Sequence, residues 1–195
     1  MSKIEILKQE MLSKKIFPLK YITYTKPGPQ ANVQSQENEV YFRPDAVAVL
    51  LADPQKQIFL LTRQFRLPSY LNGNETGYLV ESCAGLIDEG ESPEQAARRE
   101  VKEETGYLIT ELKKIGAVYS SAGGITEFLH LFIGFFDSSG SHEGGGGLEE
   151  EGEDIETIEI SFEQAKDNLR KGLINDAKTL ALLQHFFMNA STRQF

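Results

Sequence analysis

The sequence has few of the features that mark several large classes of protein. Its 195 residues include a single cysteine, Cys83, so no disulfide can form within the chain. The lone cysteine favours a reducing, cytoplasmic location, and no cluster of Cys and His suggests a zinc site. No apolar run approaches the ~20 residues that a transmembrane helix requires, so we expect no membrane partner.

Basic residues are also in short supply. The chain has 20 Lys and Arg against 29 Asp and Glu, which gives a formal net charge of −9. Proteins that bind the phosphate backbone of nucleic acids need a basic face, so this excess of acid argues against a nucleic-acid partner. The hydrophobic content of 40% and the charged content of 25% are those of a globular protein, and the length suits one ordinary domain with an N-terminal extension.

Helix-starting and helix-ending residues predict a helix over residues 93–105. Ser92 is a favourable N-cap residue, and Gln95 stands where a capping box needs its partner. Gly106 is placed to end the helix in the left-handed conformation. Acidic residues are concentrated on this predicted helix.

Glu103 and Glu104 follow Glu100 by three and four residues, so all three share one face of the predicted helix. Like charges at the wider spacing destabilise a helix by roughly 0.2–0.5 kcal/mol per pair, and Arg99 can offset part of this through Glu103. A hard divalent cation would offset the rest, since Mg²⁺ prefers carboxylate and water oxygens. Spacing alone leaves two interpretations open, a metal site or a solvated acidic face.

The segment 85–107 resembles the Nudix box, a signature of glycine, acidic and basic residues at fixed intervals. The matching residues are Gly85, Glu91, Arg99, Glu100, Val101, Glu103, Glu104 and Gly106, and Tyr107 departs mildly from the last, apolar position. The resemblance implies an α/β fold, a Nudix-type α/β/α sandwich with a mixed sheet. It also implies hydrolysis of a nucleoside diphosphate linked to another moiety, with Mg²⁺ or possibly Mn²⁺ as cofactor.

Further segments resemble the nucleoside diphosphate-sugar pyrophosphatases, and most of all the bacterial GDP-mannose pyrophosphatases. These segments are 63–66, 72–75, 81–85, 123–127, 153–156 and 176–179. The resemblance favours GDP-mannose as substrate, with ADP-ribose or another ADP-sugar as the alternative. It also implies a homodimer with shared active sites, in which residues 1–44 are a small N-terminal β arm for dimerisation and residues 45–195 are the hydrolase domain.

The same resemblance implies a role for each candidate site residue. The implied metal ligands are Glu100, Glu104, Glu153 and the backbone carbonyl of Ala84. Glu153 and Glu103 compete as the base that activates water, and Arg99 orients Glu103. The implied substrate ligands are Arg66 for the diphosphate, and Glu127 and Lys178 for the sugar or the phosphates.

Each substrate assignment has an alternative. Arg66 could instead form a surface ion pair. Glu127 could be a solvated residue at a strand end, and Lys178 could be an exposed lysine on a helix. Glu153 stands among several acids, so Glu151 and Asp154 are alternatives for its role. An alternative function of a different class is a non-catalytic nucleotide-sugar sensor, against which the intact box residues count.

The match to the GDP-mannose enzymes departs at three places. Ser121-Ala122-Gly123 lacks the proline of that group, Glu37-Asn38 replaces a basic pair, and Ile16 replaces an aromatic residue. These positions bear on the base and the sugar, whereas the diphosphate chemistry depends on the box itself.

Hydrophobic patterning along the rest of the chain predicts strands between residues 17 and 160 and helices after them. The predicted strands are 17–25, 40–42, 46–52, 58–62, 78–83, 112–119, 127–136 and 155–160. Two late helices are predicted, one between Ser161 and Gly172 and one over 176–188. Residues 137–154 are predicted to form a loop whose glycines at 144–147 allow it to move.

Overall fold

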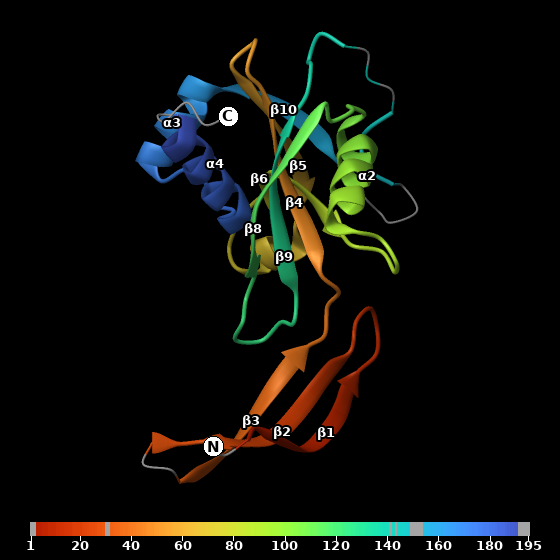
Figure 1. Cartoon of the computed structure of the whole chain (residues 1–195), viewed down its shortest axis with the longest axis vertical. Helices are drawn as coiled ribbons and strands as arrows, with labels where there is room; N and C mark the ends of the chain where they lie inside the picture. Colours follow the sequence, from red (N-terminus) through yellow and green to blue (C-terminus); the bar gives the residue numbers. More distant parts are fainter. Residues whose placement is uncertain (1–2, 30–31, 141, 143, 149–153, 191–195) are drawn as a thin grey trace. The chain divides into compact units, whose positions relative to one another are not determined.

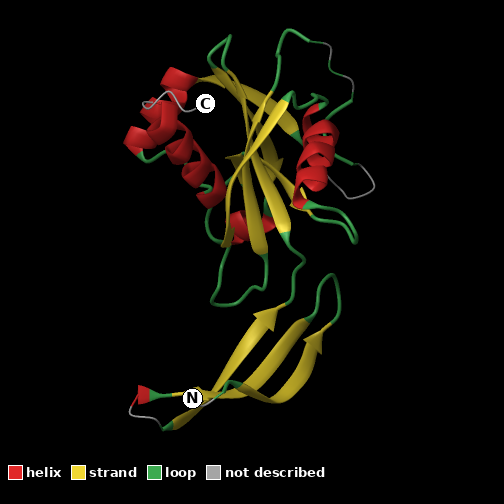
Figure 2. Ribbon diagram, in the orientation of Figure 1, coloured by secondary structure: helices red, strands yellow, loops and turns green. Residues whose placement is uncertain are grey.

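The computed structural model describes residues 3–29, 32–140, 142, 144–148 and 154–190 (Figures 1 and 2). The chain divides into two compact units. The first consists of Met1–Asp45 with Val118–Leu129, and the second of Ala46–Ala117 with His130–Phe195.

The first unit contains a three-stranded sheet of β1 (Glu5–Ser13), β2 (Leu19–Pro27) and β3 (Val33–Tyr41). Both pairings are antiparallel. The predicted strand at 17–25 is confirmed within one or two residues, whereas the prediction for β3 was too short, because the strand begins in a polar stretch. Cross-strand hydrogen bonds account for these polar residues, since the Tyr21 hydroxyl donates to Glu37 (2.5 Å) and the Tyr24 hydroxyl to Asn38 (3.0 Å).

A seven-stranded sheet forms the second architectural element. Its main path runs β10 (Glu156–Ser161), β5 (Ile58–Phe65), β4 (Ala46–Asp53), β9 (Phe128–Phe135) and β8 (Glu111–Tyr119). Two short strands lie off this path, with β6 (Tyr78–Glu81) on β5 and β7 (Cys83–Leu86) on β4. Every residue of β4 is buried, as its continuous apolar run predicts for a central strand.

Helices cover both faces of this sheet, which confirms the predicted α/β/α sandwich (Figures 1 and 2). One face carries α2 (Pro93–Thr105), and the other carries α3 (Phe162–Lys171) and α4 (Ala177–Ala190). The short helix α1 (Leu67–Leu71) joins β5 to β6 and was not predicted. None of the helices in the described residues combines the length and the apolar composition needed to cross a bilayer.

The predicted caps of α2 and α3 are confirmed. Ser92 and Gln95 form a reciprocal capping box, and Gly106 ends α2 in the left-handed conformation with φ 74°. In α3, the Ser161 side chain accepts from the backbone N–H of Gln164 (3.1 Å). Local residue choices therefore fix where the helices that support the site begin and end.

Buried apolar residues fill the space between the sheet and α2. The cluster consists of Val47, Val49, Leu51, Leu60, Cys83, Ala96, Ala97, Val101, Ile109, Phe132 and Phe136. Tyr107, the mild departure in the box, packs against this core with its ring 4.9 Å from that of Phe136. On the opposite face, Phe59 and Phe186 make an edge-to-face contact beneath α4.

The prediction of one strand over 78–83 was wrong, because the chain changes partner at Ser82. Glu81 pairs with Thr62 of β5, whereas Cys83 pairs with Val49 of β4. Between them, the backbone N–H of Ser82 donates to the Thr179 hydroxyl (2.7 Å). The start of α4 thus holds the chain at the point where β6 gives way to β7.

Candidate active site

Arg99 holds the acidic residues of the box together. Its guanidinium contacts both carboxylate oxygens of Glu91 (3.1 and 2.9 Å), one oxygen of Glu100 (2.8 Å) and one of Glu103 (3.0 Å), and it donates to the Leu86 carbonyl (2.9 Å). The hydrogen bonds to Glu91 and the other carboxylates hold the pKa of Arg99 above its usual range, and the same contact lowers the pKa of Glu91. One cation thus organises three carboxylates between the loop and the helix.

A glycine at the end of the central sheet makes room for the Glu100 carboxylate. A Cβ atom added at Gly85 would lie 2.0 Å from Cδ of Glu100, so only glycine lets this carboxylate lie against the β7 backbone. Ala84, whose carbonyl is a predicted metal ligand, is the adjacent residue and pairs in register with Ala48. The geometry therefore brings Glu100 beside the backbone of 84–85.

The box residues fit a hard divalent cation by their donor chemistry. Glu100 and Glu104 are both buried, the latter only 1% exposed, on the same helix as Glu103. Carboxylate and carbonyl oxygens are the ligands that Mg²⁺ accepts, and burying acids without a balancing cation is costly. Within the described ranges, no three acidic, His or Cys side chains are already arranged around an ion position. Glu100 and Glu103 instead accept hydrogen bonds from Arg99. The candidate Glu153 lies outside the described residues.

A second charged cluster centres on Glu81, at the end of β6. Its carboxylate accepts from Arg66 Nε (2.7 Å) and Nη2 (3.2 Å), and it also accepts from Lys178 Nζ. Lys178 in turn contacts Asp176 (2.9 Å). Burial alone would raise the pKa of Glu81, which is 2% exposed, but the bonds to Arg66 and Lys178 lower it. Two cations thus share one buried carboxylate.

The start of α4 fixes Lys178 in this cluster. Asp176 accepts from the backbone N–H (2.9 Å) and the hydroxyl (2.5 Å) of Thr179, which is fully buried. Lys178 stands between these two residues, and its side chain is 14% exposed. The alternative interpretation of Lys178 as an exposed helix lysine is therefore wrong.

The two charged clusters are within electrostatic range of each other. Burial lowers the pKa of Arg66, but its hydrogen bonds to Glu81 and the negative charges of Glu81, Glu104 and Asp176 outweigh burial and raise that pKa. Glu104 lies on α2 with Glu100 and Glu103, so a negative charge from the first cluster acts on the guanidinium of the second. The molecule thus places a surplus of acid near a pair of cations, an arrangement that suits a divalent ion together with an anionic phosphate.

Glu127 belongs to the first unit and pairs there with Arg43. The Arg43 Nε atom lies 3.2 Å from Oε2 of Glu127, and the Glu127 side chain is 14% exposed. The neighbouring Thr126 hydroxyl donates to the Arg43 carbonyl (2.8 Å), which fixes the same corner. Glu127 is therefore not a solvated strand end.

The glycine run 144–147 lies against the C-terminal end of α2. The N–H groups of Gly146 and Gly147 donate to the carbonyls of Glu104 (2.8 Å) and Glu103 (3.2 Å). All four glycines have positive φ, and a Cβ at Gly145 would lie 2.9 Å from the Thr105 carbonyl carbon. The run therefore provides hydrogen-bond donors for carbonyls at the end of the helix that have no partner within the helix. The prediction of a movable loop did not include this role.

Sequence reasoning missed Glu81 and Asp176 as members of the site. A charged residue that ends an apolar strand run, directly before the box, was the available signal for Glu81. Its partners Arg66 and Lys178 are 15 and 97 residues away in the chain, so the pairing has no local pattern.

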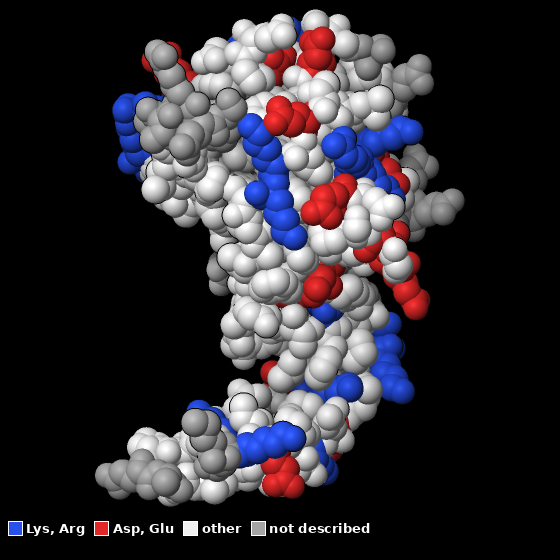
Figure 3. Space-filling model, in the orientation of Figure 1, with Lys and Arg blue, Asp and Glu red and all other residues white. Residues whose placement is uncertain are grey.

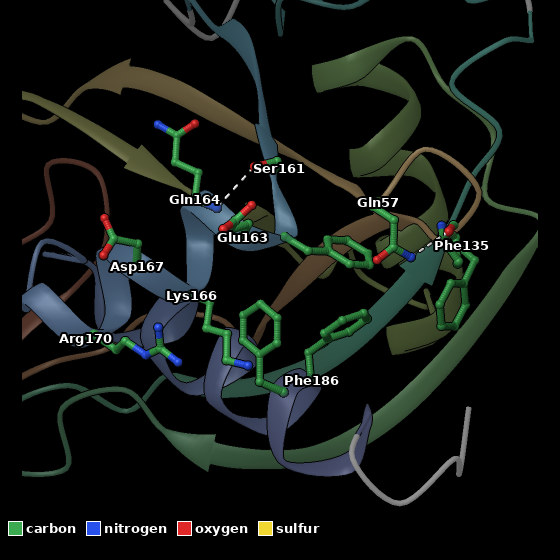
Figure 4. Close-up of a pocket in the computed structure, with 12 residues that line it drawn as sticks. Gln57, Phe135, Ser161, Glu163, Gln164, Lys166, Asp167, Arg170 and Phe186 are labelled. Atoms are coloured by element: carbon green, nitrogen blue, oxygen red, sulfur yellow. Dashed lines mark hydrogen bonds between the residues drawn. The ribbon is translucent and has the colours of Figure 1, made fainter.

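Two cavities are lined by no residue of either cluster. One, of about 1140 Å³, has aromatic walls that include Phe135 and Phe186, with charged residues of α3 at its rim (Figure 4). The other, of about 820 Å³, is lined mainly by apolar and amide side chains between β6 and α3. Neither is lined by a predicted site residue. On the face seen in Figure 3, acidic and basic side chains are interspersed.

Comparison with known proteins identifies relatives of the whole chain. The profile of the NUDIX domain matches residues 42–183. The GDP-mannose pyrophosphatase of Cronobacter sakazakii is 43% identical over 182 residues, covering 93% of this chain and 94% of the relative. That of Pectobacterium atrosepticum is 43% identical over 184 residues, covering 94% of each. A solved structure described as an ADP compounds hydrolase superposes with a TM-score of 0.74 at 18% identity, covering 100% of this chain and 98% of that one, and is alike in fold.

Proposed function

The chain belongs to the NUDIX domain family, and we propose that it hydrolyses the diphosphate bond of a nucleoside diphosphate-sugar, with GDP-mannose preferred. The products are a nucleoside monophosphate and a sugar phosphate. Nudix hydrolases generally use divalent metal ions, and we assign Mg²⁺ here, with Mn²⁺ as a substitute.

The observation that carries this proposal is the pairing of an acid-rich cluster with a cluster that holds two cations. Glu104 and the carboxylates gathered by Arg99 offer oxygen ligands, while Arg66 and Lys178 offer donors for phosphate oxygens. The negative charge of Glu104 contributes to the raised pKa of Arg66, which supports a site where an ion and a diphosphate act together.

Each residue of the site has a proposed task. Glu100, Glu104 and the Ala84 carbonyl hold the metal ion, and Arg66 grips the diphosphate with its planar fork. The ion, when bound, neutralises phosphate charge and lowers the pKa of water.

Three further tasks complete this assignment. Lys178 and Glu127 contact the phosphates or the sugar. Glu103, oriented by Arg99, and Glu153 remain the two candidates for the base that takes the proton from water.

The relatives support GDP-mannose over ADP-ribose or another ADP-sugar. Those named GDP-mannose pyrophosphatase are 41–43% identical to this chain. The departures at Glu37 and Asn38 lie on β3, where both side chains accept from tyrosines of β2. This pair lacks the positive charge of the basic pair in the GDP-mannose enzymes, so ADP-sugars are included in the test.

A panel of substrates tests the proposal. The purified chain is incubated with GDP-mannose, ADP-ribose, ADP-glucose or a nucleoside triphosphate, with Mg²⁺, with Mn²⁺ or with chelator, and products are quantified after phosphatase treatment. We expect GDP-mannose to be cleaved fastest and only with metal. Tight binding of GDP-mannose without cleavage would favour the sensor, and preference for triphosphates would contradict the assignment.

We also propose that residues 1–44 are an arm that joins two copies into a homodimer with shared sites, in the cytoplasm. Strand β1 supports this because both of its faces expose large apolar residues, including Ile6 (50%), Leu7 (53%) and Leu12 (45%). Sedimentation equilibrium should give about twice the chain mass of 21.8 kDa. A mass near the single-chain value in the unmodified protein would contradict the dimer, and Leu7→Ser should weaken it.

A further inference from the structure

We propose that Glu81 is a positioning residue for substrate binding, which sets Arg66 and Lys178 as a preorganised clamp for the diphosphate. The inference rests on the proposed function and deepens it, because it names the buried group that determines where the two substrate cations stand. Glu81 contacts both cations directly, through separate hydrogen bonds from each.

The geometry at Arg66 leaves one edge of the guanidinium for a ligand. Glu81 takes the Nε and Nη2 edge in a two-bond fork, with no partner for Nη1 among the described residues. A guanidinium has five N–H donors in a fixed plane, so a carboxylate on one edge determines where the other edge points. The Arg66 side chain is 38% exposed while that of Glu81 is 3% exposed, so the fork joins a buried carboxylate to a side chain that a ligand can reach.

Lys178 donates to the same carboxylate and follows Glu81 in the sequence, whereas Arg66 precedes it. Lysine is a flexible point charge that loses much rotamer freedom when it is fixed, so a buried anchor is needed to hold it at one place. Oε2 of Glu81 accepts from Lys178 and from Arg66 Nη2, and this shared atom sets the spacing of the two cations. Asp176 supplies a second contact to Lys178 and caps α4, so the helix cannot shift without breaking the cluster.

Glu81 is also tied to the metal-binding side of the site. Only Ser82 and Cys83 separate it from Ala84, whose carbonyl is the proposed metal ligand, and Ser82 is held by Thr179. The clamp and the metal ligand therefore stand on one short, pinned segment. This placement fixes the distance between the site for the diphosphate and the site for the ion.

The test compares Glu81→Gln with the matched control Glu156→Gln, which removes the carboxylate from the exposed Arg63–Glu156 pair (3.0 Å) on neighbouring strands. For each we measure KM and kcat with GDP-mannose, the affinity for GDP by calorimetry without metal, Mn²⁺ affinity by electron paramagnetic resonance, and thermal unfolding. We expect Glu81→Gln to raise KM and weaken GDP binding by roughly 10–100-fold, with kcat and Mn²⁺ affinity changed far less. Glu156→Gln should match the wild type.

Other outcomes have defined meanings. Unchanged KM and GDP affinity in folded Glu81→Gln would overturn the inference, as would an equal loss of Mn²⁺ affinity, which indicates general disruption. If Glu81→Gln does not fold, Glu81→Asp decides, because its shorter reach keeps the charge but cannot span both cations; a raised KM supports the clamp and a normal KM rejects it. If the wild type cleaves no nucleoside diphosphate-sugar, the proposed function fails. The GDP affinities of the wild type and Glu81→Gln then decide alone whether Glu81 positions the two cations.

Discussion

The two charged clusters of the second unit are built from the same kinds of group in different proportion. Around Arg99, one cation binds Glu91, Glu100 and Glu103 and leaves a surplus of acid. Around Glu81, one buried carboxylate accepts from two cations. In each cluster one buried or half-buried group acts as the organiser, Arg99 for the acids and Glu81 for the two cations, and Asp176 balances the second cation. A divalent ion suits the first cluster and a diphosphate the second.

The largest expected effect comes from removing a buried acid of the first cluster. Glu104→Gln keeps the size of the side chain but removes the charge proposed to hold the metal, so we expect turnover of GDP-mannose to fall more than ~100-fold. Steady-state kinetics at saturating Mg²⁺ measure this. Glu94→Gln, an exposed change in the first turn of the same helix, is the control and should retain near-normal turnover. Comparable turnover in Glu104→Gln and Glu94→Gln would contradict the proposed role of the first cluster in holding the metal ion.

Changing the second cluster should affect binding more than turnover. Arg66→Lys keeps the positive charge but loses the planar fork that joins Glu81 to a phosphate, so we expect KM for GDP-mannose to rise roughly 10-fold. Arg63→Lys, on β5 three residues before Arg66 and at an ion pair with exposed Glu156, is the matched control. Equal KM values for the two variants would show that the fork at residue 66 has no part in substrate binding.

A smaller change at a glycine sharpens the metal side of the comparison. In Gly85→Ala the new methyl group meets the Glu100 carboxylate, which must move away from the backbone of 84–85. We expect Mn²⁺ affinity to fall roughly 10-fold with little loss of folded structure. Gly116→Ala, where an added Cβ meets nothing within 4 Å, is the control. Unaltered affinity in Gly85→Ala would mean that Glu100 does not bind the ion beside β7.

The glycine run at the end of the box helix should affect stability more than chemistry. Gly145 has φ +95° and is in close contact with Thr105, so Gly145→Ala should cost about 1–2 kcal/mol or more in the free energy of unfolding. Gly144→Ala is a matched control, since it has φ +77° but open space. Denaturant titration should rank Gly145→Ala below Gly144→Ala, and the reverse order would contradict the contact with α2.

The smallest effect concerns pH. Arg66 and Lys178 lower the pKa of Glu81 in the folded state, against the effect of burial. Its charged form therefore stabilises the fold above the unfolded pKa of ~4.3, and this contribution is lost as pH falls through the lower folded pKa. The difference in unfolding free energy between wild type and Glu81→Gln should be constant near neutrality and shrink below about pH 4. A difference that grows on acidification would have the wrong sign.

The sequence was sufficient where structure depends on neighbours in the chain. Ser92, Gln95 and Gly106 bound α2 as predicted, because capping requires only residues within one turn. The Arg99–Glu103 contact is likewise a one-turn pair. The fold followed from patterning together with the family resemblance.

The rest depends on contacts between distant segments. The break at Ser82 requires Thr179, and the role of Glu81 requires Arg66 and Lys178, none of which follows from periodicity. The prediction for β3 covered only its last residues, because the rest of the strand is polar and its side chains pair with tyrosine hydroxyls of β2 rather than alternating with apolar residues. Glu153 lies outside the described residues, so its competition with Glu103 as base remains a prediction.

Relaxation of ³¹P nuclei by bound Mn²⁺ tests most directly whether the acids of α2 hold an ion beside a diphosphate. In wild-type protein with a slowly cleaved analogue of GDP-mannose, Mn²⁺ should shorten the relaxation times of both phosphorus nuclei strongly, and Glu104→Gln should abolish the effect while the analogue still binds. Equal relaxation in the two proteins, or none in the wild type at saturating ion and analogue, would contradict the account.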